Sequence, residues 1–210
     1  MNRNNFIKQY ISFLTKKDII IFAGKSICQE SLKYTGLNTL CIDDNYGYGM
    51  SIVLGIAMGT KKRVYLICDD YYLLKDLGAV THFGLSKMKN LFIIIIVNGY
   101  YPFVDNMPTI TESIPNIKGL LFSSGFTIND YTRHFKTQAT SKIIKSLLLS
   151  MKGPLAVFMC PDKANEVPKH YTEFDYNITN QITELKKILK DESTALFEPP
   201  LVVVDKVEEK

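Results

Sequence analysis

The sequence predicts an α/β fold, a doubly wound and mostly parallel sheet of about six strands with helices on both faces. Short apolar runs recur along the chain, each bounded by Gly, Asp, Asn or Pro, with helix-length segments between several of them. The runs are apolar at every residue rather than at alternate residues, which is typical of parallel strands covered on both faces. The runs are residues 19–22, 39–42, 64–68, 91–97 and 155–160.

Length and composition favour one globular domain with short appendages. The chain has 210 residues, of which 46% are hydrophobic and 22% charged, close to the averages of globular proteins. Its 25 basic residues are scattered, so we expect no nucleic-acid partner. The longest apolar run, residues 91–97, is far shorter than the roughly 20 residues that cross a bilayer, and the start of the chain lacks the apolar region of a signal peptide. We therefore expect no membrane partner and a cytoplasmic location.

The four cysteines are expected to be separate, buried, small apolar side chains. Cys28, Cys41, Cys68 and Cys160 are far apart, without a Cys-x-x-Cys pair or a histidine at metal-ligand spacing. This pattern predicts neither a zinc site nor a disulfide framework.

Helical periodicity completes the pattern of elements. The first residues, from Phe6 to Leu14, read as an amphipathic helix, and a helix is expected over residues 49–58. Another helix should end before Gly125, and a last one, from residue 178, carries an apolar stripe that suits docking on the core or a subunit contact. We divide the chain into a domain at residues 1–170 and a C-terminal helix and tail at residues 171–210. Residues 199–204 form either an edge strand or an extended tail.

Residues with binding chemistry follow four of the apolar runs. In an open parallel sheet, ligands bind outside the carboxyl ends of the strands, so these residues should meet at one edge. Two glycine-bearing loops, carboxylates and an amide suit a diphosphate held by backbone N–H groups together with a divalent cation. In chain order these residues are Gly24 and Lys25, then Tyr46, Gly47 and Tyr48, then Asp69, Asp70, Tyr71 and Tyr72, and finally Asn98, Gly99 and Tyr100.

The order and spacing of these loops resemble the cofactor-diphosphate (PP) domain of thiamine-diphosphate enzymes. The likeness covers about residues 5–160, and it is strongest to the small (beta) subunit of sulfopyruvate and phosphonopyruvate decarboxylases. Residues 23–25 are similar to a Thr-Gly-Lys loop of that family, and residues 45–55 to its Ser-Met-Gly-His-Ala-Ser-Ser-Ile-Ala-Leu-Gly segment. The Gly-Asp-Gly hallmark corresponds to residues 69–71, and the family's paired asparagine to Asn98, which follows Asp70 by 28 residues.

The resemblance implies a ligand set for thiamine diphosphate and Mg²⁺. Asp70, Asn98 and the carbonyl of Tyr100 would bind the metal. The cofactor would contact Gly24, Lys25, Tyr46, Gly47, Tyr48, Asp69, Tyr71 and Tyr72.

Both glycines of the hallmark are replaced, and each replacement predicts a conflict. A Cβ at Tyr71 disfavours a positive φ and would crowd the anion. A carboxylate at Asp69 would repel the diphosphate unless it points away or takes part in metal binding.

Simpler interpretations of the same residues stay open. An aspartate at a strand end often caps the next helix, and Asn98-Gly99 is a common turn dipeptide. His82 is expected to be a structural or surface histidine rather than a catalytic base. No catalytic residue is predicted.

Two hypotheses of function follow. In the family, a glutamate on a separate pyrimidine-binding domain activates the cofactor, and the sequence has no second doubly wound pattern. The chain is either the diphosphate- and metal-binding subunit of a split 2-oxo acid decarboxylase or a degenerate, non-catalytic homologue with a binding or structural role. The first would need a pyrimidine-binding partner subunit, or assembly of copies, and a small anionic 2-oxo acid such as a sulfonate or phosphonate. An unrelated nucleotide binder is disfavoured because the sequence has no Walker or Gly-x-Gly-x-x-Gly motif after the first strand.

Overall fold

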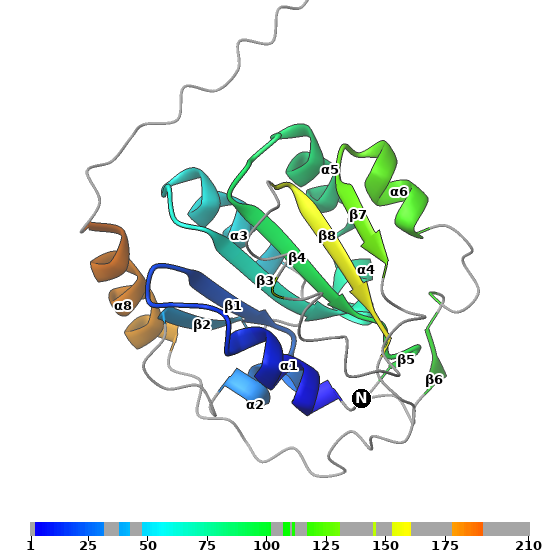
Figure 1. Ribbon diagram of the computed structural model, residues 1–210, viewed down its shortest axis with the longest axis horizontal. Coiled ribbons are helices and arrows are strands. Elements are labelled where there is room, and N and C mark those ends of the chain that lie inside the picture. Colours follow the sequence, from blue (N-terminus) through cyan, green and yellow to red (C-terminus); the bar gives the residue numbers. More distant parts are fainter. Residues whose placement is uncertain are drawn as a thin grey trace, which may run out of the picture.

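The computed structural model contains a parallel sheet with helices on both faces (Figure 1). It describes residues 3–31, 38–42, 48–101, 107–109, 111, 117–130, 145, 153–160 and 178–190. The sheet has six strands in the order β2-β1-β3-β4-β8-β7, and every pairing between them is parallel. The strands are β1 (Ile19–Ala23), β2 (Asn38–Ile42), β3 (Val64–Asp69), β4 (Leu91–Ile96), β7 (Thr127–Asp130) and β8 (Leu155–Met159). The predicted fold class is confirmed.

Five of these strands coincide with the apolar runs, and β7 is the one that the sequence analysis missed. It has four residues, Thr-Ile-Asn-Asp, so it offers no apolar run. It pairs only with β8 and forms the edge of the sheet. The preceding helix, α6 (Ile117–Ser123), ends before Gly125, whose φ is +98°, as predicted.

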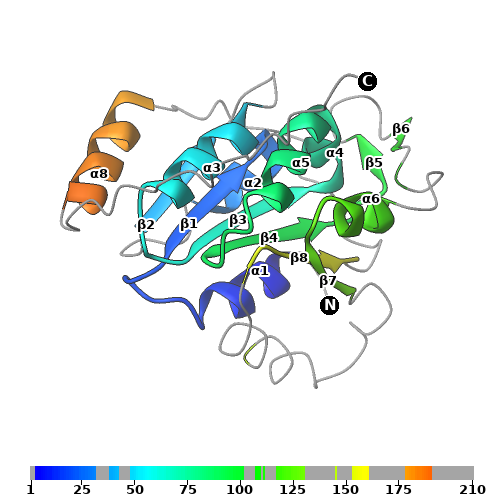
Figure 2. The same cartoon turned by 90° about the horizontal axis from the view of Figure 1, so that it is seen from above.

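Helices cover both faces of the sheet (Figure 2). One face packs against α1 (Arg3–Ile11) and α2 (Lys25–Ser31). The other packs against α3 (Gly49–Met58), α4 (Asp70–Lys75), α5 (Leu77–Leu85) and α6. None of the helices in these described ranges combines the length and apolarity needed to cross a membrane. The cytoplasmic location stays a prediction.

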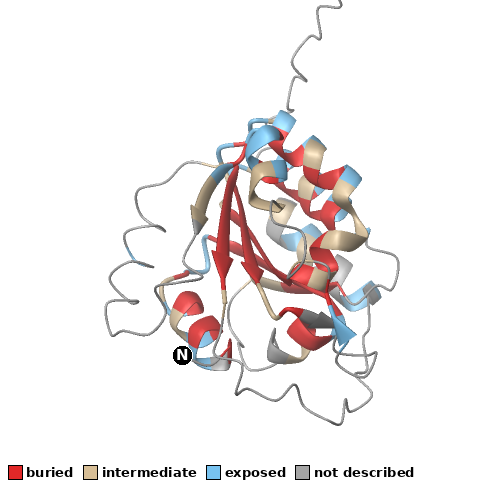
Figure 3. Ribbon diagram, turned by 90° about the vertical axis from the view of Figure 1, so that its right-hand side faces the viewer, coloured by how far each residue is buried: buried red, intermediate tan, exposed pale blue. Residues whose placement is uncertain are grey.

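The central strands bury every residue, because alternate side chains enter two separate cores (Figure 3). In β1, Ile19 and Ile21 point into the core beneath α3 and α5, whereas Ile20 and Phe22 point into the core beneath α1. This double burial explains why the strands read as continuous apolar runs rather than as alternating ones.

The C-terminal helix α8 (Ile178–Lys190) lies next to β2, at the edge of the sheet opposite β7. Leu185 and Leu189 are partly buried against the core that α3 and α5 cover. Part of the predicted apolar stripe therefore docks on the domain itself. The division at residue 170 stays a prediction, and residues 199–204 lie outside the described residues.

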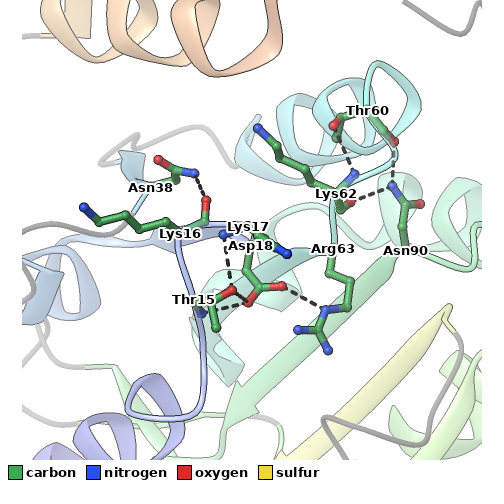
Figure 4. Close-up of polar contacts among 9 residues, drawn as sticks. All are labelled: Thr15, Lys16, Lys17, Asp18, Asn38, Thr60, Lys62, Arg63 and Asn90. Carbon is green, nitrogen blue, oxygen red and sulfur yellow. Dashed lines mark hydrogen bonds and ion pairs between the residues drawn. The ribbon is translucent and has the colours of Figure 1, made fainter. Parts of the chain in front are cut away.

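A polar network fixes the edge of the sheet where the strands begin (Figure 4). The buried carboxylate of Asp18 accepts hydrogen bonds from the backbone N–H of Thr15 at 2.8 Å and from its hydroxyl at 3.1 Å. The same carboxylate forms a 2.8 Å ion pair with Nε of Arg63. Asp18 precedes β1 and Arg63 precedes β3, so the pair fixes the starts of two neighbouring strands.

Asn90 gives the same edge a second anchor. Its Nδ2 lies within hydrogen-bond distance of the carbonyls of Ala57, Thr60 and Lys62, at 3.0, 2.9 and 3.1 Å. These contacts join the end of α3, and the loop that follows it, to the start of β4. The network is structural and lies at the end of the strands opposite the predicted site.

The structure joins Cys28 of α2 to Cys41 of β2 through a disulfide, so the prediction of four separate thiols is wrong for this pair. Both side chains belong to the core beneath α1, and their Cα atoms are 5.4 Å apart. The pairing depends on β2 lying beside β1, which cysteine spacing does not reveal. Cys68 is a buried thiol, as expected, whereas Cys160 is only partly buried. Disulfides are rare in the reducing cytosol, so this bond bears on the predicted cytoplasmic location.

We expect unreduced, denatured protein to react with an alkylating reagent at two of its four cysteines, and reduced protein at all four. The bond closes a segment with a sequence separation of 13, so replacing Cys28 and Cys41 by Ala should lower the free energy of unfolding by about 3 kcal/mol. Mass spectrometry counts the labels and urea denaturation measures the loss. Cys160→Ala is the matched control and should leave the pair intact. Four labels without reduction would contradict the pairing.

Candidate functional site

The predicted site lies at the edge of the sheet where the strands end. Parallel pairing places Asp69, the last residue of β3, opposite Ile96, the last residue of β4. Asp70 and Asn98 therefore lie just beyond neighbouring strand ends. Gly24 follows β1, and its backbone N–H donates to the carbonyl of Ile42 at the end of β2, at 3.0 Å. The topology brings together the strand ends that the sequence analysis singled out.

Asp69, the last residue of β3, caps the N-terminus of α4. Its carboxylate accepts hydrogen bonds from the backbone N–H of Tyr72 at 2.8 Å and from the hydroxyl of Ser26 at 2.9 Å. Burial raises the pKa of Asp69 to about 6, an effect that nearby Asp70 increases and the two hydrogen bonds oppose. Of the interpretations that the sequence left open, the structure shows an aspartate at a strand end that caps the next helix.

Asp70 is also buried, and its carboxylate is surrounded by donors from this chain. The backbone N–H groups of Asn98 and Gly99 each donate to it at 3.2 Å. The hydroxyl of Thr109 donates to it at 3.1 Å, and the hydroxyl of Thr111 also donates to it. The carboxylate thus has donors at both oxygens, all within the protein.

The two threonines reach Asp70 because the chain turns back after β4. The short strands β5 (Tyr100–Tyr101) and β6 (Met107–Pro108) pair antiparallel, and the N–H of Thr109 donates to the carbonyl of Gly99 at 3.0 Å. Sequence analysis missed both threonines because their only signal is a hydroxyl some forty residues from Asp70. The carbonyl of Tyr100 belongs to this ribbon, and its role as a metal ligand stays a prediction.

Asn98 contacts Asp70 through its backbone rather than through its side chain. Its Nδ2 atom is buried and has no hydrogen-bond partner within the described residues. Asp70 and Asn98 are therefore close together, as predicted. A hydrogen bond from the Asn98 backbone joins them, and a metal shared by their side-chain oxygens stays a prediction.

Tyr71 has no positive φ, although the glycine at its place in the hallmark would allow one. It lies in the first turn of α4, and the one described residue other than glycine with a positive φ is Lys87. Its half-buried ring has the ammonium of Lys75 at 4.5 Å from its centre. The backbone at Tyr71 is therefore helical rather than in the positive-φ region, and the predicted crowding of an anion stays a prediction.

The next residue, Tyr72, fills the space between Gly24 and Gly49. Its side chain is fully buried, and its hydroxyl accepts a 3.1 Å hydrogen bond from the N–H of Gly49, the first residue of α3. A Cβ placed on Gly49 would lie 2.1 Å from that hydroxyl, and a Cβ on Gly24 would lie 3.2 Å from the ring. The glycine at position 49 is therefore needed to accommodate this tyrosine, and a Cβ at position 24 would be in tight contact with its ring.

The remaining predicted residues lie around this cluster or outside the described ranges. Lys25 is exposed at the start of α2, and Tyr48 is 63% exposed before α3. Tyr46 and Gly47 lie outside the described residues. His82 is exposed on α5, as expected for a surface histidine.

The sequence is similar to sulfopyruvate decarboxylase subunit beta from Methanocaldococcus jannaschii. The two are 23% identical over 154 residues, which cover 70% of this chain and 81% of that subunit. No protein-family model matches the sequence.

Solved structures share the fold. Benzoylformate decarboxylase from Polynucleobacter necessarius matches with a TM-score of 0.58 and 13% identity, over 79% of this chain and 34% of that one. A protein from Mycobacterium smegmatis described as a thiamin diphosphate-dependent enzyme matches with a TM-score of 0.56 and 15% identity, over 77% of this chain and 32% of that one. This chain has the fold of thiamine-diphosphate-dependent enzymes. It spans about a third of the length of these two proteins.

As folded, the site does not fit a magnesium diphosphate. Metal binding by Asp70 would compete with the hydrogen bonds that its carboxylate now accepts, and the ring of Tyr72 occupies the space between Gly24 and Gly49. In the described part of the chain, no three His, Cys, Asp or Glu side chains are grouped to hold a metal ion. The cofactor and metal roles assigned to these residues stay predictions.

We expect Asp69 to make stability depend on pH. Its pKa is raised by folding, so the protonated side chain stabilises the fold below about pH 4, and this contribution is lost as the pH rises through 6. Asp69→Asn keeps a cap for Tyr72 N–H but stays neutral. The free energy of unfolding of the variant, relative to the native chain, should therefore rise by about 2 to 3 kcal/mol between pH 4 and pH 7. Urea denaturation at several pH values measures this difference, and parallel curves would contradict it.

We expect Asp70→Ala to destabilise the fold without any metal present. The substitution leaves the backbone N–H groups of Asn98 and Gly99 and two hydroxyls without their acceptor, at a cost of about 3 to 5 kcal/mol. Thr109→Val, which removes one donor, is the matched control and should cost about 1 to 2 kcal/mol. Urea denaturation measures both, with and without Mg²⁺. A loss that occurs only when Mg²⁺ is present would show that Asp70 acts as a metal ligand instead.

Proposed function

We propose that this chain is the beta-type subunit of a two-chain assembly related to sulfopyruvate decarboxylase, with a structural or binding role in it. The observation that carries the proposal is the similarity to a named subunit of such an enzyme, which extends over 81% of that subunit. The shared fold supports it. A partner chain would supply the pyrimidine-binding half, including the glutamate that activates the cofactor in the family.

The geometry favours the structural or binding role over cofactor binding by this chain. The carboxylate of Asp70 joins α4 to the turn after β4. The hydroxyl of Tyr72 accepts a hydrogen bond from the first N–H group of α3. Both residues hold positions that the family uses for the metal and the diphosphate. Their contacts here stabilise the domain as it stands.

The edge of the sheet that carries the site is the face proposed to meet the partner. Tyr48 is 63% exposed beside α3, and Met107 is 56% exposed in β6. Large apolar side chains at one edge are typical of surfaces that another chain covers. A small anionic 2-oxo acid remains the substrate class proposed for the whole assembly, with the groups that recognise it on the partner.

We expect this chain to form a stable hetero-oligomer when it is co-expressed with a pyrimidine-domain subunit from the same genome. Size-exclusion chromatography with light scattering gives the mass of the complex. The purified chain alone, supplied with thiamine diphosphate and Mg²⁺, should not release carbon dioxide from sulfopyruvate or phosphonopyruvate. Turnover by the isolated chain would contradict the proposal.

A pair of surface variants tests the face. Tyr48→Asp should weaken the assembly at least tenfold because it places a charge in the proposed contact. Phe122→Asp is the matched control, since Phe122 is 71% exposed on α6, away from this edge. Equal losses for the two variants would place the contact elsewhere.

A further inference from the structure

We infer that Tyr72 is a built-in occupant of the diphosphate position, so that this chain holds a latent anion site closed by one side chain. The inference rests on the proposed function and adds to it a reason why this subunit needs no cofactor. It concerns the three elements that meet at the end of β1, β2 and β3.

The hydroxyl of Tyr72 accepts a hydrogen bond at a helix N-terminus, as the oxygen of a bound anion would. The first N–H groups of a helix have no partner within the helix and attract oxygen atoms and negative charge. Helix α3 has ten residues, and its capping residue, Tyr48, makes no side-chain hydrogen bond to it. The N–H of Gly49 donates to the phenol of Tyr72 instead. An internal oxygen therefore occupies the place where a diphosphate oxygen would bind.

The ring of Tyr72 uses the space that the glycines leave. Gly24 has a φ of +95°, which favours glycine, and the Tyr72 ring lies against the side where a Cβ would be, with the nearest ring carbon at 3.2 Å from that position. At Gly49, the hydroxyl lies within 2.1 Å of a Cβ position. An anion that approached the backbone closely would need the space left by the absence of side chains at these two glycines. The ring already fills that space, so the ring and the anion exclude each other.

Neighbouring contacts hold the ring in place. Asp69 accepts from the N–H of Tyr72, which fixes the start of α4, and the buried carboxylate of Asp70 fixes the same turn to Asn98 and Gly99. Lys75 on α4 lies 5.9 Å from the ring centre of Tyr72 and 4.5 Å from that of Tyr71. Removing the ring would open a space bounded by the α3 N-terminus and two glycines, with Lys75 one turn away.

The experiment is calorimetric titration of the folded chain with inorganic diphosphate, with and without Mg²⁺. Tyr72→Ser should give a measurable heat of diphosphate binding, and the native chain should bind at least tenfold more weakly. Tyr72→Phe keeps the ring and should remain closed. Tyr71→Ser is the matched control, because it removes a neighbouring tyrosine that does not enter the space, and it should remain closed as well.

Two results would overturn the inference: native protein that binds diphosphate as tightly as Tyr72→Ser, or a folded Tyr72→Ser that binds none. If Tyr72→Ser does not fold, NMR spectra of the native chain with and without diphosphate test the inference instead. The amide resonance of Gly49 should be protected from exchange and unmoved by diphosphate, whereas a diphosphate-dependent shift there would overturn the inference. Assembly with a partner is measured separately by light scattering, so its failure would count against the proposed function and not against this closed site.

Discussion

The carboxylate of Asp70 is the contact on which the described edge of the sheet depends. A buried carboxylate is costly unless donors surround it, and here the donors come from the turn after β4 and from the segment that follows β6. The N–H groups of Asn98 and Gly99 fix the turn after β4, while Thr109 and Thr111 fix the chain beyond the β5–β6 ribbon. One side chain therefore connects the first turn of α4 to two segments that lie far from it in the sequence.

Because Asp70 and the cap at Asp69 fix α4, the direction of Tyr72 is fixed as well. Its hydroxyl then meets the N–H of Gly49 and completes the N-terminus of α3. Contacts that begin at the end of β3 thus reach the helix that follows β2. The residues that occupy the positions of a metal ligand and a cofactor-contacting residue in the resembling family work here as internal connectors.

The fold could be predicted because its signal is local: the four central strands and the edge strand β2 coincide with apolar runs, and α8 has helical periodicity. The positions of the site residues at one edge also followed from parallel topology. Side-chain direction could not be predicted in the same way. Asp69, Tyr71 and Tyr72 lie within four residues of each other, yet one points to Ser26, one lies half-buried beside Lys75, and one enters the space between two glycines. The disulfide and the threonine contacts depend on pairing between distant segments, for which neither spacing nor periodicity carries a signal.

The two halves of the closed site support each other through α4, which starts at Asp70 and carries Tyr72 in its first turn. Turning the ring out would expose about 150 to 250 Å² of aromatic surface and leave the N–H of Gly49 without its partner. A metal at Asp70 would in turn compete with donors that hold the turn after β4. A diphosphate and its metal would therefore have to replace both sets of contacts together. In a chain with glycine or serine at position 72, a ligand would have to replace only the hydrogen bonds to Asp70 and would not have to displace a ring. The identity of residue 72 therefore decides how readily Asp70 can bind a metal ion.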